Sequence, residues 1–219
     1  MFSPERRETT LIAPIARDPY ENCGLVLLGG SRGCLPVVQR ILTALPPEFA
    51  APLVIVIHRA SSSEDLLTPL LQRCSALPVT EAIDKEPLLA GHVYVAPADY
   101  HLLIERDSLT LSIDDPVHYA RPSIDVLFES AALLCGCSTV AIVLSGGGCD
   151  GAAGAACIEA RGGTVLIEDP ASASCPDLPA AARKLTQRAR LLSAAQLGSA
   201  LCELLAADTL DRKGPSNAQ

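Results

Sequence analysis

Short apolar runs, each followed by a segment with helical periodicity, recur along this chain and limit its fold more than any other feature. The clearest run is 53–57, Leu-Val-Ile-Val-Ile, which is unbroken and mostly β-branched, as in a parallel strand buried on both faces. The expected strands of this kind are 25–28, 53–57, 140–144 and 164–168, and the expected helices are 35–45, 63–74, 123–134, 151–160, 179–184 and 194–205. Strands that alternate with helices predict an α/β fold, a doubly wound and mostly parallel sheet with helices on both faces.

The middle of the chain has a different pattern. Four short apolar segments follow one another without long helical stretches between them, and Arg106-Asp107-Ser108 has the composition of a hairpin connection. The segments are 79–83, 91–96, 102–105 and 109–113. We expect them to form a small antiparallel insertion on the parallel core.

Length and composition favour one full-sized domain. The chain has 219 residues, of which 49% are hydrophobic, enough for a substantial core. Residues 1–22 are polar and lack the apolar segment of a signal peptide, so we expect an N-terminal extension, a globular domain over 23–207 and a flexible tail over 208–219. The net charge of -8 argues against nucleic-acid binding, and no apolar run is long enough for membrane insertion. The expected location is the cytoplasm.

The nine cysteines and four histidines show no metal-binding pattern. An odd cysteine count without regular spacing is a poor disulfide framework. The Cys135/Cys137 pair lacks the spacing of a zinc site, so no metal is expected. Most of the cysteines are expected to pack as small buried hydrophobes. Cys34 and Cys149 flank the two Gly-rich turns and are alternative nucleophiles, although packing is the favoured interpretation for them too. Three of the histidines are expected singly at the surface: His92, His101 and His118.

A Gly-x-Ser-x-Gly turn, Gly29-Gly-Ser-Arg-Gly33, joins the first expected strand to the first expected helix. In this context such a turn presents a serine hydroxyl as a nucleophile, and Gly29 and Gly33 would adopt backbone angles forbidden to larger residues. The free N–H groups at the start of the following helix would also face developing negative charge. The competing interpretation is an ordinary turn in which Ser31 caps the helix.

Three polar residues follow three expected parallel strands: Ser31, His58 and Asp150. The carboxyl ends of parallel strands lie on one edge of the sheet, so these side chains are expected to meet there. A serine needs a base to take its proton, and a carboxylate holds the histidine in the productive tautomer. Taken alone, His58 could be a polar strand end and Asp150 the N-cap of the next helix. The order Ser, His, Asp differs from the Ser, Asp, His order of α/β-hydrolases.

The chain resembles the CheB family, the chemotaxis protein-glutamate methylesterases, over about residues 25–205. The matching segments are Gly29-Gly-Ser-Arg-Gly33, Val54-Ile-Val-Ile-His58, Pro87-Leu-Leu-Ala-Gly-His-Val-Tyr-Val-Ala-Pro97, His101-Leu-Leu103, Arg121-Pro-Ser-Ile-Asp-Val-Leu-Phe128, Ser145-Gly-Gly-Gly-Cys-Asp-Gly151 and Glu168-Asp-Pro-Ala-Ser172. The resemblance implies hydrolysis of γ-glutamyl methyl esters, and often deamidation of glutamines, on a methyl-accepting chemotaxis receptor-like partner. It implies no cofactor. By this resemblance Ser31 falls on the nucleophile, His58 on the base and Asp150 on the orienting carboxylate.

The same resemblance places the oxyanion and substrate contacts on two loops, at Arg32 and Gly33 after the first strand and at Gly147 and Gly148 before the aspartate. The chain departs from the family at three positions. Arg32 replaces a small hydroxyl residue, Gly147 replaces the methionine of a Gly-Met-Gly loop, and Ala120 replaces the histidine before Arg-Pro-Ser.

These departures keep a second function open, a catalytically weakened methylesterase-like module that binds partners in a chemosensory pathway. A third alternative is a hydrolase of similar fold that acts on a small-molecule ester. Residues 1–22 are also too short for the receiver domain that commonly precedes this catalytic domain. We therefore expect an open catalytic edge whose turnover does not respond to a phosphodonor.

Overall fold

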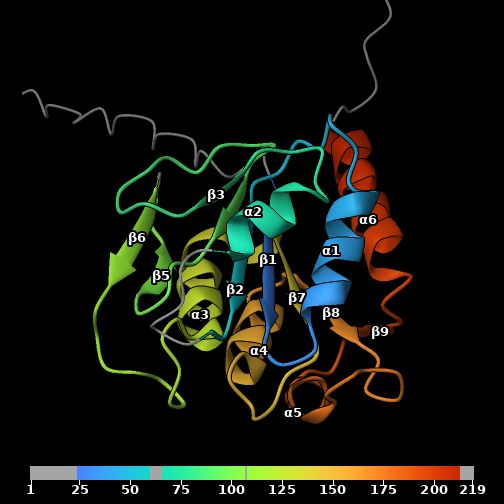
Figure 1. Cartoon of the computed structure of the whole chain (residues 1–219). Helices are drawn as coiled ribbons and strands as arrows, with labels where there is room; N and C mark the ends of the chain where they lie inside the picture. Colours follow the sequence, from blue (N-terminus) through green and yellow to red (C-terminus); the bar gives the residue numbers. More distant parts are fainter. Residues whose placement is uncertain (1–23, 60–65, 107, 213–219) are drawn as a thin grey trace, which may run out of the picture.

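In the computed structural model, which describes residues 24–59, 66–106 and 108–212, seven parallel strands form one sheet (Figure 1). Their order is β3-β4-β2-β1-β7-β8-β9. The strands are β1 Leu25–Gly30, β2 Leu53–Ile57, β3 Val79–Glu81, β4 Val93–Val95, β7 Thr139–Val143, β8 Thr164–Glu168 and β9 Arg190–Leu192. The central strands are apolar and buried, as parallel strands between two helical layers must be. The predicted doubly wound parallel sheet is confirmed.

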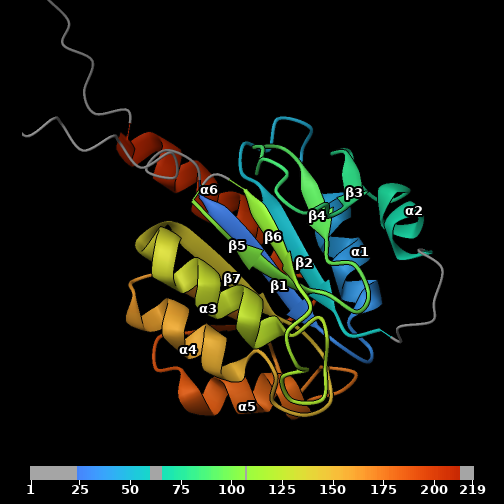
Figure 2. The same ribbon diagram turned by 90° about the vertical axis from the view of Figure 1, so that its left-hand side faces the viewer.

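Helices cover both faces of the sheet (Figure 2). One face carries α1 (Leu35–Ala44), α2 (Leu67–Gln72) and α6 (Leu197–Arg212). The other face carries α3 (Ile124–Cys135), α4 (Ala152–Ala160) and α5 (Asp177–Leu185). A 3₁₀ turn at Gly136–Ser138 joins α3 to β7. Because side chains alternate along a strand, Leu27 of β1 packs towards α3 and α4, whereas its neighbour Leu28 packs towards α1 and α6. The sheet therefore has an aliphatic core on each face.

A separate antiparallel hairpin, β5 (His101–Ile104) and β6 (Leu109–Ser112), packs over α3. It confirms the small antiparallel insertion, but only for two of the four segments assigned to it. The segments 79–83 and 91–96 contain β3 and β4, which join the main sheet in parallel. Their assignment was wrong because a short apolar run does not specify its partner: β4 pairs with β2, which is distant along the chain.

Other differences concern single elements. β9 was not predicted, because its sequence Arg-Leu-Leu is a short edge segment without an apolar run. The helix α6 continues to Arg212, so residues 208–212, expected in the tail, are helical. Several expectations lie outside the described residues: the N-terminal extension 1–22, residues 63–65 of an expected helix, Asp107 of the hairpin connection, and the tail from 213 to 219.

The strand β1 is at the point where the strand order reverses. The chain proceeds from β1 to β2 on one side and returns to β7 on the other. In doubly wound sheets a crevice forms at such a point, beside the carboxyl ends of the strands. The residues that follow β1, β2 and β7 therefore lie together.

Candidate active site

Ser31 is the first residue after β1 and begins the turn into α1. Its N–H donates to the carbonyl of Ser145 (2.9 Å), just after β7, and its own carbonyl accepts from the N–H of Cys34 (3.2 Å). Cys34 is the N-cap of α1, and no side chain caps this helix. The hydroxyl of half-buried Ser31 is therefore not used as a cap, and the capping interpretation was wrong.

The two outer glycines of the turn have different roles. Gly33 has φ +88°, a left-handed conformation that side chains disfavour, as expected. Gly29 lies in β1 without a positive φ, so the prediction of a special backbone angle there was wrong. Instead, a Cβ at Gly29 would collide with Ile124 at the start of α3. This close approach brings the N-terminus of α3 against the end of β1.

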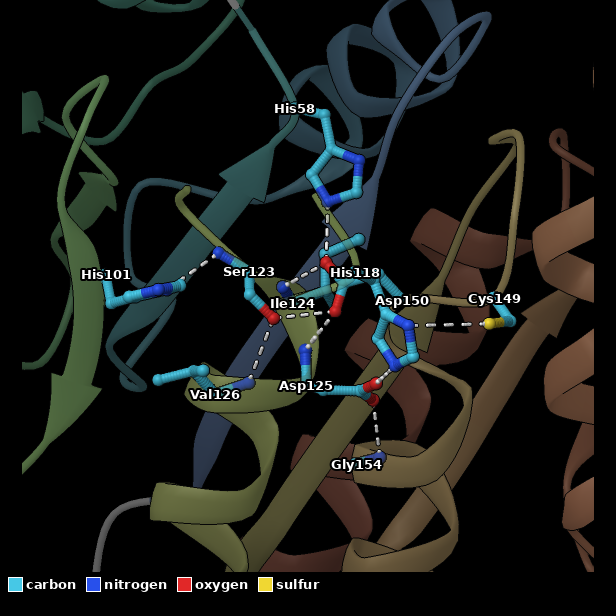
Figure 3. Close-up of polar contacts among 10 residues, drawn as sticks. All are labelled: His58, His101, His118, Ser123, Ile124, Asp125, Val126, Cys149, Asp150 and Gly154. Carbon is cyan, nitrogen blue, oxygen red and sulfur yellow. Dashed lines mark hydrogen bonds and ion pairs between the residues drawn. The ribbon is translucent and has the colours of Figure 1, made fainter. Parts of the chain in front are cut away.

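His58 is the first residue after β2, and its N–H donates to the carbonyl of Gly30 (3.2 Å) at the end of β1. This bond fixes His58 beside the turn that carries Ser31. Its Nε2 lies 2.6 Å from Oδ2 of Asp150, in the loop after β7 (Figure 3). Nδ1 is the ring nitrogen left to exchange a proton with another group. The structure thus joins His58 to Asp150 directly, whereas no hydrogen bond within the described residues links the Ser31 hydroxyl to His58.

Asp150 is buried and accepts four hydrogen bonds from described residues (Figure 3). Besides the His58 contact, they come from the Ser123 hydroxyl (2.6 Å) and from the N–H groups of Ile124 (2.7 Å) and Asp125 (3.1 Å). Burial by itself would raise the pKa of Asp150, but these hydrogen bonds outweigh it and hold the pKa below its usual value. The carboxylate therefore stays ionised at neutral pH and can stabilise a protonated His58.

The backbone donors to Asp150 belong to the first turn of α3. The Asp150 carboxylate therefore accepts hydrogen bonds from N–H groups that have no partner within the helix. The helix α4, which follows Asp150 along the chain, has Gly151 as its N-cap and no side-chain cap. The interpretation of Asp150 as the N-cap of α4 was therefore wrong. The positive end of the α3 dipole adds to the stabilisation of its negative charge.

Two supporting residues were not assigned to the site from the sequence. Ser123 was expected as the N-cap of α3, which is confirmed, but its hydroxyl also donates to Asp150. His101 was expected at the surface, yet it is buried. Its Nδ1 accepts from the N–H of Ser123 (3.2 Å), and its Nε2 donates to the carbonyl of Asp115 (3.1 Å). The available signal was the segment 121–125, Arg-Pro-Ser-Ile-Asp, to which the motif analysis gave no chemical role.

A buried carboxylate holds the start of the loop between β7 and α4. Glu168, at the end of β8, accepts from both the N–H (2.7 Å) and the hydroxyl (2.8 Å) of Ser145. The carbonyl of Ser145 in turn accepts from the N–H of Ser31 (2.9 Å). Glu168 thus fixes the turn after β1 relative to the loop after β7.

The residues predicted to bind the oxyanion lie on these two loops. The N–H groups of Arg32 and Gly147 donate to no acceptor within the described residues. Gly148 has φ +84° and open space where a Cβ would be. The exposed Arg32 guanidinium donates to Sγ of Cys175 (3.5 Å) and lies 3.6 Å from the Cβ position of Gly147. Arg32 therefore extends over the loop that contains Gly147.

A cavity of about 460 Å³ opens beside His58, and its lining includes His118, Arg59 and Arg121. Arg59 is held by the carboxylate of Glu81 (2.6 Å), and Arg121 by two main-chain carbonyls (2.9 and 3.0 Å). Arg121 also lies 3.7 Å from Asp99, another residue of this lining, so both guanidinium groups have a carboxylate neighbour.

The cysteines only partly match their predicted packing role. Burial raises the pKa of the Cys34 thiol to about 12, which makes it a poor nucleophile. Cys135 and Cys175 are also buried, but three further cysteines are exposed: Cys137, Cys149 and Cys157. Of the two alternative nucleophiles, Cys34 is excluded by its burial, and the exposed Cys149 remains.

The described residues contain no group of three or more His, Cys, Asp or Glu side chains that could hold a metal ion. Among the described helices, none is both long enough and apolar enough to span a membrane.

Known proteins resemble this chain over most of its length. The model of the CheB methylesterase family matches residues 26–201. A putative protein-glutamate methylesterase/protein-glutamine glutaminase of Leptospira interrogans is 36% identical over 173 residues, which cover 78% of this chain and 90% of that protein. A protein-glutamate methylesterase/protein-glutamine glutaminase of Carboxydothermus hydrogenoformans is 37% identical over 190 residues, 84% of this chain but 55% of that protein.

Among solved structures, the crystal structure of the Thermotoga maritima CheB methylesterase catalytic domain superposes with a TM-score of 0.79 at 31% sequence identity. The match covers 83% of this chain and 98% of that domain. The family match also spans the ends of β1, β2 and β7, where Ser31, His58 and Asp150 lie. The chain therefore belongs to the CheB methylesterase family.

Proposed function

We propose that this chain is a serine carboxylic-ester hydrolase that removes methyl groups from glutamate side chains of chemoreceptor-like signalling proteins. Its family supports the reaction class, and the names of its relatives support the substrate. The observation that carries the proposal is the 2.6 Å contact between His58 and Asp150, beside the turn that begins with Ser31. A buried, ionised carboxylate holds a histidine next to a serine whose hydroxyl caps no helix.

In the first step, Ser31 attacks the ester carbonyl while Nδ1 of His58 takes the hydroxyl proton. Asp150 keeps His58 in the tautomer with an unprotonated Nδ1 and stabilises the imidazolium that forms. The imidazolium then gives its proton to the departing methanol. The step needs a Ser31–His58 hydrogen bond, and such bonds commonly tighten only in the substrate complex.

The oxyanion of the tetrahedral intermediate accepts from the N–H groups of Arg32 and Gly147, and each such donor contributes about 10²–10³-fold in rate. Water, activated by the same His58, then releases the free carboxylate. With a glutamine side chain the same steps release ammonia, which accounts for deamidation. Protein groups supply every proton transfer in this scheme, which uses no cofactor.

The proposed partner is the cytoplasmic signalling region of a methyl-accepting receptor-like protein. The assay is methanol release from methylated receptor signalling domains by the wild-type chain, by Ser31→Ala and by the control Ser199→Ala, which changes an exposed serine of α6. We expect release by the wild type and Ser199→Ala and almost none by Ser31→Ala. Release by Ser31→Ala at the wild-type rate would overturn the mechanism.

A catalytically weakened binding module is the competing function, and the position of Arg32 over Gly147 favours it. This alternative predicts that the chain binds methylated receptor domains in calorimetry but releases no methanol. Hydrolysis of small-molecule esters without any release from receptor domains would instead identify a small-molecule esterase. Methanol release that depends on Ser31 decides for the methylesterase.

A further inference from the structure

A second histidine–carboxylate pair lies next to the first and faces a cysteine (Figure 3). Nε2 of His118 is 3.5 Å from Oδ2 of Asp125, and its Nδ1 is 4.0 Å from Sγ of Cys149. In the tautomer with the proton on Nε2, that N–H lies beside the Asp125 carboxylate, and the unprotonated Nδ1 can accept the thiol proton. The proposed ester hydrolysis uses none of these three side chains.

The backbone holds His118 in an uncommon conformation. His118 and Tyr119 have φ of 49° and 62°, and they form a two-residue loop closed by reciprocal hydrogen bonds between Val117 and Ala120 (3.1 and 2.9 Å). A positive φ at both central residues is the type I′ turn, which Asn, Asp and Gly normally form. Non-glycine residues adopt such angles at a cost, and they concentrate at functional sites. The turn places the imidazole against α3.

The side chain of Asp125 is buried and hydrogen-bonded. It is 5% exposed, and its Oδ1 accepts from the N–H of Gly154 (2.7 Å) in α4. A cavity of about 600 Å³, between α4 and α5, is lined by Asp125, His118 and the exposed Cys149. Lys184 and Asp177 are the other charged residues of this lining. The cavity is large enough for a small molecule attached to the thiol.

We propose that Cys149 is a site of reversible S-thiolation by low-molecular-weight disulfides, with His118 as its base and Asp125 orienting the base. His118 takes the thiol proton, and the Cys149 thiolate attacks one sulfur of the disulfide. The Cys149–sulfur bond forms as the sulfur–sulfur bond of the reagent breaks. The released thiolate takes the proton back from His118. Excess thiol reverses the exchange.

Two other exposed cysteines of the chain are internal controls. Partial desolvation of its thiol, together with the negative charges of Glu129 and Asp125, raises the pKa of Cys157, so it is expected to react slowly. Cys137 is exposed without a histidine partner among the described residues. Cys137 is the matched control, because exposure alone would make it react as fast as Cys149, whereas a histidine base would favour Cys149.

The test follows mixed-disulfide formation at each cysteine by mass spectrometry, with glutathione disulfide added to the full chain at neutral pH. We expect Cys149 to react about tenfold faster than Cys137 or Cys157. In His118→Asn that advantage should fall to about twofold or less, because Asn tolerates a positive φ but supplies no base. Tyr119→Asn, in the same turn, should retain the full advantage.

Equal rates at the three cysteines in the wild-type chain would overturn the proposal, as would an unchanged Cys149 rate in His118→Asn. If both turn variants lose the advantage, the comparison is repeated with His118→Gln. Wild-type reactivity in that variant would likewise overturn the role of His118. The measurement needs no ester substrate, so its result stands whichever way the methanol assay falls.

Discussion

Two histidine–aspartate pairs meet at the N-terminus of α3, and their surroundings differ. His58 and Asp150 are 2.6 Å apart, and the His58 side chain is 20% exposed. His118 and Asp125 are 3.5 Å apart, and the His118 side chain is 49% exposed. Hydrogen bonds outweigh burial at Asp150 and lower its pKa, whereas burial dominates at Asp125 and, with the nearby charge of Asp150, raises the pKa. The same residue types are thus tuned in opposite directions by the number of donors around each carboxylate.

The two histidines are also carried by different backbones. The N–H of His58 bonds to the carbonyl of Gly30, so His58 is fixed by the parallel sheet itself. The backbone of His118 belongs instead to a two-residue turn with positive φ angles, outside the sheet. Side chains held by regular secondary structure are positioned more precisely than side chains on a loop. This precision suits His58 to ester hydrolysis, whereas the thiol of Cys149 needs only a nearby base such as His118.

The largest expected effect tests whether the His58 pair acts as one unit with Ser31. Ser31→Ala and His58→Ala should each lower kcat for methanol release by about 10⁵–10⁶-fold, and the double variant should be little worse than either. Single-turnover assays of all three variants make this comparison. Losses that multiply in the double variant would contradict a shared mechanism.

The next effect separates the two aspartates. Asp150→Asn should lower kcat by about 10⁴-fold, because an amide at this position favours the wrong tautomer of His58. Asp125→Asn should lower kcat by less than about tenfold, because Asp125 orients only His118 in our scheme. Circular dichroism of both variants serves as the folding control. Equal losses in the two variants would mean that the pairs form one network.

Most of the fold could be predicted from local patterns. The strands at 53–57 and 164–168 have their predicted bounds, because a short apolar run between helical stretches leaves few other arrangements. The direction of β3 and β4 could not be predicted, because it depends on pairing with β2, far away along the chain. A short run of apolar residues fits either a parallel or an antiparallel neighbour.

The candidate site was predictable where residues follow strands. Ser31, His58 and Asp150 lie at the expected edge, since parallel strands bring their carboxyl ends together. The second pair was not predictable, because a His-Tyr sequence gives no indication of a type I′ turn. The roles of Ser123 and His101 depend on contacts between α3, β5 and the loop after β7, which no local pattern encodes.

The two carboxylates should also make opposite contributions to stability as pH changes. The lowered pKa of Asp150 means that its stabilisation is complete above the unfolded value of about 3.9 and disappears as pH falls through the folded pKa. The raised pKa of Asp125 means that its stabilisation is complete below the unfolded value and is lost as pH rises through the folded pKa.

Urea unfolding of Asp150→Asn and Asp125→Asn between pH 3 and 7 measures these contributions. The decrease in the free energy of unfolding caused by Asp150→Asn should grow with pH to about 1.5–3 kcal/mol, the range for hydrogen bonds to a charged acceptor. The decrease in the free energy of unfolding caused by Asp125→Asn should become smaller as pH rises from 3 to 7, because the amide resembles the protonated acid. Parallel pH dependences for the two variants would show that the opposite pKa shifts do not determine their stability.

The smallest effect concerns Arg32, a charge that belongs to neither pair and lies over the loop of Gly147. An exposed guanidinium at the edge of the His58 pair is suited to acidic side chains around the modified glutamate, and exposed ion pairs are weak and screened by salt. Arg32→Thr should therefore raise KM by about three- to fivefold, leave kcat nearly unchanged and weaken the salt dependence of kcat/KM. Initial rates on methylated receptor domains at low and high salt measure all three quantities. A higher kcat at unchanged KM would show that Arg32 obstructs the site. In that case Arg32 lowers the rate at which Ser31 and the His58 pair hydrolyse the ester.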